Sequence, residues 1–417
     1  MKKQLVLSSL AIILSSGLTQ NVLAQDVEVL HWWTSGSEAA ALNVLKDDLK
    51  SKGYGWQDMP VAGGGGESAM TTLKARVTGG NPPTAAQLLG VAVQDWANEG
   101  SLGDLSSVAK ADGWDAVVPD AVKDFAINDG KWVAVPVNIH RPNWLWVNAT
   151  IFKENGLTPP TTWEEFNTVS NTLKAKGITP LAHGGQPWQD LTIFDDVVLG
   201  VGGPDFYRKA IHELDMDALG SDTMVKVFDQ MRIIRGFVDK DFSGRDWNLA
   251  TAMLINGKAA MQLMGDWAKG EMTHANVTPG KDILCLPAPS TAGSFLFISD
   301  FFAGFDVGAN DRDAQGALAS SVLSKKFQEE FNLVKGSIPA RTDISRTRFD
   351  ACAQKSMDDL AEAQEKGTLI GSLAHGTAQG ASVQSAISDV VTYHFNSDIG
   401  SKEAVDILVN AIQDAML

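Results

Sequence analysis

Short extended runs alternate with helix-like segments along the chain, and this alternation restricts the possible folds more than any other feature. Residues 27–31 have the pattern of a strand, and residues 38–49 have that of a helix. Residues 132–137 and 145–147 are further extended runs, and residues 162–177 form a well-bounded helical segment. The pattern predicts α/β units with largely parallel sheets, whose ligands gather at the carboxyl ends of the strands.

The first 24 residues have the pattern of a secretory signal peptide. Lys2 and Lys3 make a basic start, an apolar run follows, and Ala24 is the small residue of a cleavage site. The apolar run is shorter than the roughly 20 residues that a membrane-spanning helix needs, which argues against a permanent anchor. We therefore expect residues 1–24 to be removed and the mature chain to be exported to a periplasm.

The mature chain would be long and acidic. About 390 residues remain, which suits two domains of roughly 150 residues each with elaborations. Loss of Lys2 and Lys3 changes the formal charge from −16 to −18. A chain with this charge is a poor partner for nucleic acid or for an anionic membrane surface.

Cys285 and Cys352 are the only cysteines in the sequence. Two cysteines in an oxidising compartment usually pair, and closing a loop of this length can stabilise a fold by about 4 kcal/mol. We therefore predict a disulfide, with two buried thiols as the alternative. No histidine stands near them at the spacing of a zinc site, so we expect no metal.

The sequence contains no motif that is specific for catalysis. HExxH, GxSxG and GxxxxGK[ST] are all missing, and Gly63–Gly66 has the composition of a flexible turn without the residues of a phosphate loop. The 50 acidic residues allow a glycoside hydrolase with paired carboxylates, but so many acids provide such pairs by chance. That enzyme class stays open as an alternative.

Tryptophan usage is more informative. The chain has 12 Trp but only 3 Tyr, and several Trp lie beside polar or glycine-rich turns. An indole ring offers a flat apolar face to the C–H side of a sugar ring, while its N–H can pair with a polar group. These tryptophans are Trp32, Trp33, Trp144, Trp146, Trp188, Trp247 and Trp267.

Three ordered segments resemble a known family. They are NWLWVNATIFKENGLTPPTTWEEF at residues 143–166, INGKAAMQLMGDWAKGEM at 255–272 and FNLVKGSIPARTD at 331–343. Together with the signal peptide and HWWTSGSE at 31–38, they are similar to the extracellular solute-binding proteins of ABC sugar importers, within the periplasmic glucose/mannose-binding branch.

The resemblance implies an α/β fold with two lobes, a hinge and a ligand cleft between them. It assigns residues 25–138 and 299–345 to the N-terminal lobe, and residues 139–298 and 346–417 to the C-terminal lobe. It implies a monomer that binds a monosaccharide and delivers it to the transmembrane subunits of an ABC permease, without a cofactor and without enzymatic activity. D-glucose is the expected ligand, with mannose, galactose, xylose or a short oligosaccharide as alternatives.

The resemblance also implies a set of ligand contacts. They fall on Trp32, Trp33, Glu38, Gln87, Trp267, Asp300, Lys335 and His375. If strand geometry persists through Trp32 and Trp33, only one of the two indoles can stack on the sugar, and we favour Trp33. Glu38 has an alternative role, because Ser35 and Glu38 have the spacing of a helix-capping box.

One part of the site departs from the family pattern. Leu88 and Leu89 follow Gln87 where relatives carry polar groups, so side-chain contacts at these positions are in doubt and the hydroxyl preference can differ. Further candidates near the first crossover are His140, Arg141 and Asn143, although Arg141 can instead serve the contact between the lobes.

Overall fold

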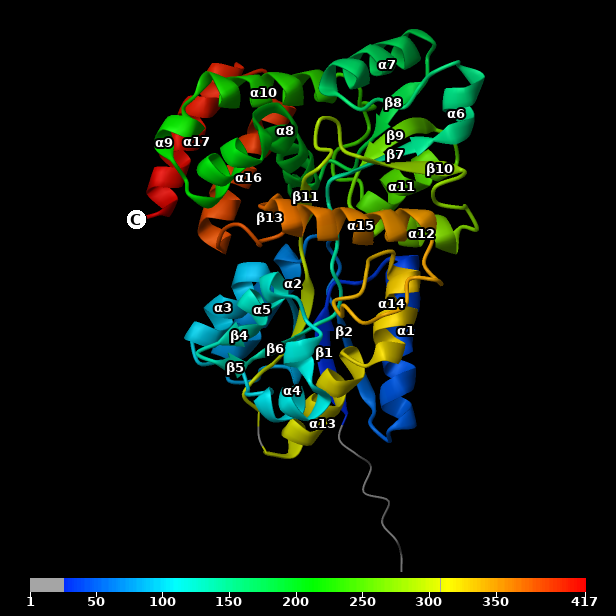
Figure 1. Ribbon diagram of the computed structural model, residues 1–417. Coiled ribbons are helices and arrows are strands. Elements are labelled where there is room, and N and C mark those ends of the chain that lie inside the picture. Colours follow the sequence, from blue (N-terminus) through cyan, green and yellow to red (C-terminus); the bar gives the residue numbers. More distant parts are fainter. Residues whose placement is uncertain (1–25, 308) are drawn as a thin grey trace, which may run out of the picture.

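The computed structural model describes residues 26–307 and 309–417, which form two lobes stacked one above the other in Figure 1. The predicted signal peptide at residues 1–24 lies outside the described residues. No helix within residues 26–307 and 309–417 is long and apolar enough to cross a membrane. The α/β fold with two lobes agrees with the expectation from the sequence.

The first lobe is built on a five-stranded sheet with the order β2-β1-β3-β12-β6. Its elements are β1 (Val27–His31), α1 (Gly36–Ser51), β2 (Trp56–Pro60), α2 (Glu67–Thr78), β3 (Ala85–Leu89), α3 (Gly90–Asn98), α4 (Ser106–Asp112), the short 3-10 helix η1 (Trp114–Ala116), α5 (Asp120–Ala126), β4 (Ile127–Asn128), β5 (Lys131–Trp132), β6 (Ala134–Pro136), β12 (Asp300–Gly304), α13 (Ala309–Val322) and α14 (Lys325–Lys335).

The second lobe is built on a four-stranded sheet with the order β10-β7-β9-β8. Its elements are β7 (Trp144–Asn148), α6 (Ala149–Glu154), α7 (Trp163–Ala175), β8 (Thr179–Ala182), α8 (Pro187–Tyr207), the π-helix η2 (Arg208–His212), α9 (Met216–Leu219), α10 (Asp222–Arg235), α11 (Trp247–Ile255), β9 (Ala259–Leu263), α12 (Ala268–His274), β10 (Ile283–Pro287), α16 (Ala381–Asn396) and α17 (Ser401–Ala415).

The expectation of largely parallel sheets is wrong. β1 is parallel to β2 and β3, but β12 is antiparallel to both β3 and β6. In the second sheet β7 is antiparallel to both of its neighbours, and only β8 and β9 are parallel. In the first sheet, the reversal follows from the chain path, since β12 re-enters the first lobe from the second and runs opposite to the strands beside it.

The predicted strand at 132–137 is also not continuous. Trp132 ends β5, which pairs with β4 in a small hairpin, and β6 starts at Ala134 and pairs with β12 in the main sheet. Between them, the N–H of Val133 donates to the carbonyl of Ala126. A single apolar run therefore supplies two different sheets.

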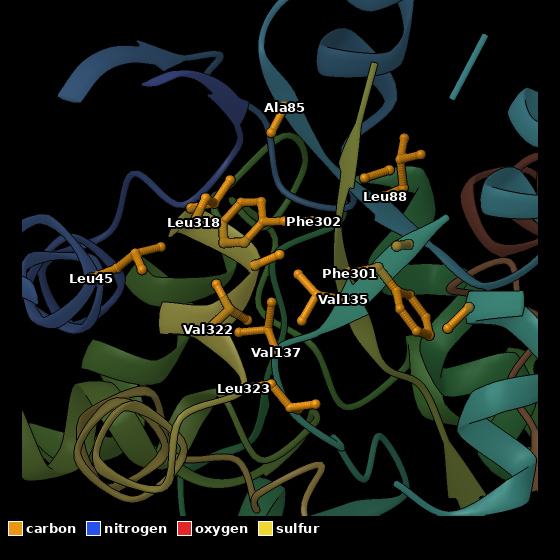
Figure 2. Close-up of a cluster of buried hydrophobic side chains, with 14 of the residues drawn as sticks. Leu45, Ala85, Leu88, Val135, Val137, Phe301, Phe302, Leu318, Val322 and Leu323 are labelled. Carbon is orange, nitrogen blue, oxygen red and sulfur yellow. The ribbon is translucent and has the colours of Figure 1, made fainter. Parts of the chain in front are cut away.

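Figure 2 shows the core of the first lobe around β12. Phe301 and Phe302 point to opposite sides of this strand because successive side chains alternate. Phe302 faces Leu318 of α13, and it also contacts Trp33 edge-to-face at a centroid distance of 5.6 Å. The core thus extends directly to the segment that follows β1.

The lobes are joined by crossing segments and by a small two-stranded sheet. Antiparallel bridges join His140 to Ile298 and Ile139 to Ile338, and β11 (Phe295–Phe297) pairs with β13 (Leu369–Gly371) in parallel. α15 (Ala351–Lys366) lies along the level where the lobes meet (Figure 1). All five strands of the first sheet lie within 25–138 and 299–345, and the boundaries between the lobes stay a prediction.

The predicted disulfide is confirmed. Cys285 of β10 is bonded to Cys352 of α15, with their Cα atoms 6.0 Å apart. The bond therefore fastens the helix at the lobe boundary to the edge strand of the second sheet.

Candidate functional site

A cavity opens between the two lobes, and we call it the main cavity. It encloses about 860 Å³ of empty space, including the part that is open to solvent at its mouth. The first lobe contributes Trp33 and Glu38 among others, and the second contributes Trp188 and Trp267. A ligand in this cavity contacts both lobes.

Trp32 and Trp33 both line the main cavity. Strand β1 ends at His31, so strict alternation does not extend to the two indoles. Trp33 is 2% exposed, and its ring lies 5.3 Å from the ring of Phe331, which ties it to the core. Trp32 packs on the backbone of Gly66, where an added Cβ would approach the indole to 3.1 Å. The stacking role of Trp33 stays a prediction.

Glu38 both caps α1 and lines the main cavity, so the two roles that the sequence allowed occur together. Its Oε2 accepts hydrogen bonds from the backbone N–H groups of Thr34 and Ser35, and the Ser35 hydroxyl accepts from the Glu38 N–H, which completes a capping box. Its Oε1 accepts from Nζ of Lys335 at 3.1 Å. Both charged side chains line the cavity, so the ion pair forms part of its wall.

Gln87 lies behind the main cavity and is fully buried. Its Oε1 accepts from the N–H of Trp32 at 3.1 Å, and its Nε2 donates to Asp300 Oδ1 at 2.8 Å. Asp300 itself lines the cavity. In this arrangement Gln87 holds Trp32 and Asp300 in position, and its amide is already committed to them.

His140 lies between two carboxylates from different lobes. Its Nδ1 pairs with Asp266, which precedes α12, and its Nε2 lies 3.3 Å from Oδ2 of Asp300 on β12. Asn138 donates to that same oxygen of Asp300 at 2.8 Å. The segment between the lobes therefore carries a buried chain of charged and polar groups.

The carboxylates determine the charge of this chain. Burial lowers the pKa of His140, but the charge of Asp266 and the hydrogen bonds to Asp266 and Asp300 outweigh it and raise the pKa. Burial raises the pKa of Asp300, but His140, Lys335 and Asn138 lower it overall. Asp300 is thus held ionised, which is opposite to what the general acid of a glycoside hydrolase needs.

His375 lies in an aromatic cluster from the second lobe. Its ring centroid is 5.1 Å from that of Trp267 and 5.8 Å from that of Trp188, and Trp267 also meets His140 edge-on at 5.3 Å. Burial, followed by the charge of His140, lowers the pKa of His375 to about 3. A neutral imidazole therefore faces the cavity, within 3.3 Å of the hydroxyl of Thr192.

The glycine-rich segment 63–66 is part of the site, although its composition predicted only a flexible turn. Gly63, Gly64 and Gly65 line the main cavity. The segment lies against Trp188 of the second lobe, and a Cβ on Gly64 would come within 2.7 Å of that indole. The lack of side chains is what permits this close approach between lobes.

Several lining residues were missed by sequence reasoning. Trp188 and Trp247 were noticed only as tryptophans beside turns, and Asp246 and Asn248 carried no signal. The structure brings seven of the eight predicted contacts to the main cavity and leaves only Gln87 behind its wall. The seven are Trp32, Trp33, Glu38, Trp267, Asp300, Lys335 and His375.

Two further candidates support the site from outside the cavity. Arg141 is fully buried, donates to Asp359 of α15 and lies over the Trp144 ring at 4.3 Å. Asn143 accepts from Arg141 and from the N–H of Leu296. These contacts brace the segment that links the lobes.

The described parts of the chain, 26–307 and 309–417, hold no cluster of three or more His, Cys, Asp or Glu side chains arranged to bind a metal ion. The main cavity instead combines indole faces with charged groups that are held by neighbouring residues. Such a cavity is suited to binding a polar ligand that has flat apolar faces.

Known proteins match the chain over most of its length. A protein of Brucella suis biovar 1 (strain 1330), named probable sugar-binding periplasmic protein, is 56% identical over 391 residues, covering 94% of this chain and 93% of the relative. A protein of Rhizobium meliloti (strain 1021) with the same name is 56% identical over 392 residues, covering 94% of each chain.

Solved structures share the fold. The bacterial solute receptor AcbH, described as having an exclusive preference for β-D-galactopyranose, matches with a TM-score of 0.80 at 18% identity, covering 94% of this chain and 99% of the receptor. Residues 34–319 match the family described as bacterial extracellular solute-binding protein. The family and these relatives are binding proteins and not enzymes. The chain therefore belongs to the bacterial extracellular solute-binding proteins.

Proposed function

We propose that this protein is the periplasmic sugar-binding component of an ABC importer, and that its ligand is a monosaccharide, D-glucose. The main cavity carries the proposal, because five tryptophans line it together with charged groups suited to hydroxyls. The names of the relatives in Brucella suis and Rhizobium meliloti support a sugar ligand and a periplasmic location.

The chemistry of a pyranose suits this wall. Trp33 and Trp267 would stack on the C–H faces of the ring, one from each lobe. Glu38, Asp300 and Lys335 would pair with the hydroxyls, and hydrogen bonds to charged groups are stronger than those between neutral groups. Because each charge already has a partner, none of them depends on the ligand to offset its burial.

The ligand would be delivered by hinge movement. Closure of two lobes around a ligand buries it and changes the outer surface, which is what a membrane permease can recognise. In this proposal the protein acts as a monomer, and the crossing segments beside His140 and Ile298 form the hinge.

Calorimetric titration with glucose, mannose, galactose and xylose tests the proposal. We expect glucose to bind most tightly, and we expect Trp33→Ala and Trp267→Ala to weaken binding while leaving the ligand-free thermal midpoint almost unchanged. Trp114→Phe is the matched control, because Trp114 is a fully buried first-lobe tryptophan that packs on Trp132, so it should change stability and not affinity.

Two results would contradict the proposal. One is the absence of heat with every monosaccharide. The other is steady release of products from an oligosaccharide with turnover, which would make the protein a hydrolase.

A further inference from the structure

The segment between β1 and α1 is held by side chains. Strand β1 ends at His31, so the backbone N–H groups of residues 32–35 lie beyond the end of that strand. These four successive N–H groups donate to side chains instead: that of Trp32 to Gln87, that of Trp33 to His31, and those of Thr34 and Ser35 to Glu38. Both neighbouring tryptophans of the main cavity are therefore fixed through their backbone.

His31 is the acceptor that holds Trp33. It is the last residue of β1, and only 1% of its surface is exposed. Its Nδ1 lies 3.2 Å from the backbone nitrogen of Trp33. Because a backbone N–H can only donate, Nδ1 must accept and carry no proton. In a neutral imidazole the proton then resides on Nε2.

The other ring nitrogen has the partner that this tautomer requires. Nε2 lies 2.8 Å from Oδ1 of Asp58 on β2, and a protonated Nε2 donates to that carboxylate. Oδ1 of Asp58 also accepts from the indole N–H of Trp56 at 2.8 Å, and Oδ2 accepts from Nζ of Lys46 at 2.9 Å. Burial raises the pKa of Asp58, but its hydrogen bonds, that from His31 first, lower it to about 2. Asp58 is thus an ionised acceptor that is fixed in place.

The surroundings of the ring keep it neutral. Burial lowers the pKa of His31, the hydrogen bond and charge of Asp58 raise it, and the net result is a lowered pKa. Two charged groups of α1 act on the ring as well, since Lys46 lowers this pKa and Glu38 raises it. A doubly protonated ring would direct a second N–H at the N–H of Trp33 and break that hydrogen bond.

The indole of Trp33 is held at its ring by different contacts. It meets Phe302 and Phe331 at centroid distances of 5.6 and 5.3 Å, and Nζ of Lys335 lies 5.8 Å from its centroid. These contacts limit the tilt of the indole, whereas the hydrogen bond to His31 fixes the backbone from which the indole projects. Residues behind a binding wall matter in this way, because a site that is loose by about 1 Å no longer fits its ligand.

We propose that His31, as a neutral imidazole protonated on Nε2, is the positioning residue that holds Trp33 against the main cavity. The inference rests on the proposed function, because it takes Trp33 as a surface that contacts the sugar. His31 is not among the residues that line the main cavity, so it would act on affinity only through Trp33.

Two substitutions separate the two hydrogen bonds of His31. Oδ1 of asparagine can take the place of Nδ1, and the amide nitrogen of glutamine can take the place of Nε2. His31→Asn therefore keeps an acceptor for Trp33 and loses the bond to Asp58, whereas His31→Gln does the reverse. In calorimetric titration with glucose, we expect His31→Asn to bind within about twofold of the parent and His31→Gln to bind roughly tenfold more weakly. Each variant loses one bond, so a role in stability alone would weaken both alike.

His394→Asn and His394→Gln are the matched controls. His394 is also a buried histidine, but it lies in the second lobe, where its ring centroid is 4.9 Å from that of Phe228. Its variants should lower the thermal midpoint and leave the glucose affinity within about twofold.

Nuclear magnetic resonance tests the tautomer without any sugar. In protein with isotope-labelled histidine, the ring of His31 should show a bare Nδ1 and a protonated Nε2 at neutral pH, with the signals assigned by their loss in His31→Asn. In protein with isotope-labelled tryptophan, the backbone N–H signal of Trp33 should stay close to its parent position in His31→Asn and move in His31→Gln.

The outcomes are distinct. A proton on Nδ1 would refute the positioning role, as would undiminished glucose binding by His31→Gln or an equal loss of affinity in both His31 variants. All three leave the proposed function standing. If the parent binds none of the sugars, the proposed function fails, and the resonance signals of His31 and Trp33 still decide whether the one residue holds the other.

Discussion

The buried ion pair between Glu38 and Lys335 lines the main cavity, and its contribution to the stability of the first lobe can be measured directly. The two side chains are 8% and 3% exposed and are joined at 3.1 Å. Glu38→Gln isolates the charge, because glutamine is also accepted at this position of a capping box and can still accept from the N–H of Ser35. Glu38→Ala removes both the cap and the charge.

The magnitudes follow from burial. Removing one partner of a buried ion pair destabilises a protein by about 3–5 kcal/mol, and loss of a helix cap by about 1 kcal/mol. We expect Glu38→Gln to cost about 3–5 kcal/mol, because its one oxygen keeps the cap and its NH2 group then faces Nζ of Lys335, which loses its acceptor. Glu38→Ala should be about 1 kcal/mol worse, and Lys335→Met should fall within the range for a broken pair. The double variant Glu38→Gln/Lys335→Met should be less destabilised than the sum by about 0.5–3 kcal/mol.

Urea unfolding of the ligand-free protein measures these values. Fluorescence and circular dichroism should give coincident transitions, which a protein with two lobes must satisfy before one free energy can describe it. Lys74→Met is the matched control, since Lys74 is exposed on α2 and its loss should change stability by no more than about 0.5 kcal/mol. Strict additivity of the two single variants would refute the energetic coupling of the pair.

Three further predictions address the rest of the site and the fold. Replacing Cys285 and Cys352 by serine should lower the free energy of unfolding by about 4 kcal/mol, measured by urea titration, because a 67-residue separation is no longer closed. In the folded protein the pKa of His375 is lowered from 6.5 to about 3, so protonation of this side chain favours the unfolded state. The free energy of unfolding of the parent should therefore fall, relative to that of His375→Gln, as the pH falls from 6.5 towards 3, and urea titration at a series of pH values measures it. Gly64→Ala should weaken sugar affinity in calorimetry by roughly tenfold with little loss of stability, since the new methyl group displaces Trp188 at the closing edge.

Local signals in the sequence predicted local structure well. Ser35 was predicted to cap a helix, and Thr162 begins the segment predicted to be helical. Both side chains accept hydrogen bonds, at the starts of α1 and α7. Caps depend on residues three or four positions away, so their signal lies within one short segment. The family resemblance then placed the cavity residues, which come from segments that are far apart in the chain.

Side-chain direction and strand direction could not be predicted in the same way. Gln87 turns toward Trp32 and Asp300 because those groups leave a buried donor and acceptor to satisfy, and neither lies near it in sequence. The antiparallel entry of β12 depends on where the chain crosses back from the second lobe. Both outcomes follow from tertiary contacts, which periodicity does not encode.

The two lobes contribute different kinds of side chain to the main cavity, and this arrangement favours closure. Glu38, Asp300 and Lys335 come from the first lobe, and contacts to Lys335, Gln87 and Asn138 hold the two carboxylates in place. The second lobe contributes mainly indole faces, which need no directed hydrogen bond to make contact. Because the groups that read hydroxyls are already oriented, closing the hinge does not require the polar wall to reorganise, and less of the binding free energy is lost to ordering side chains.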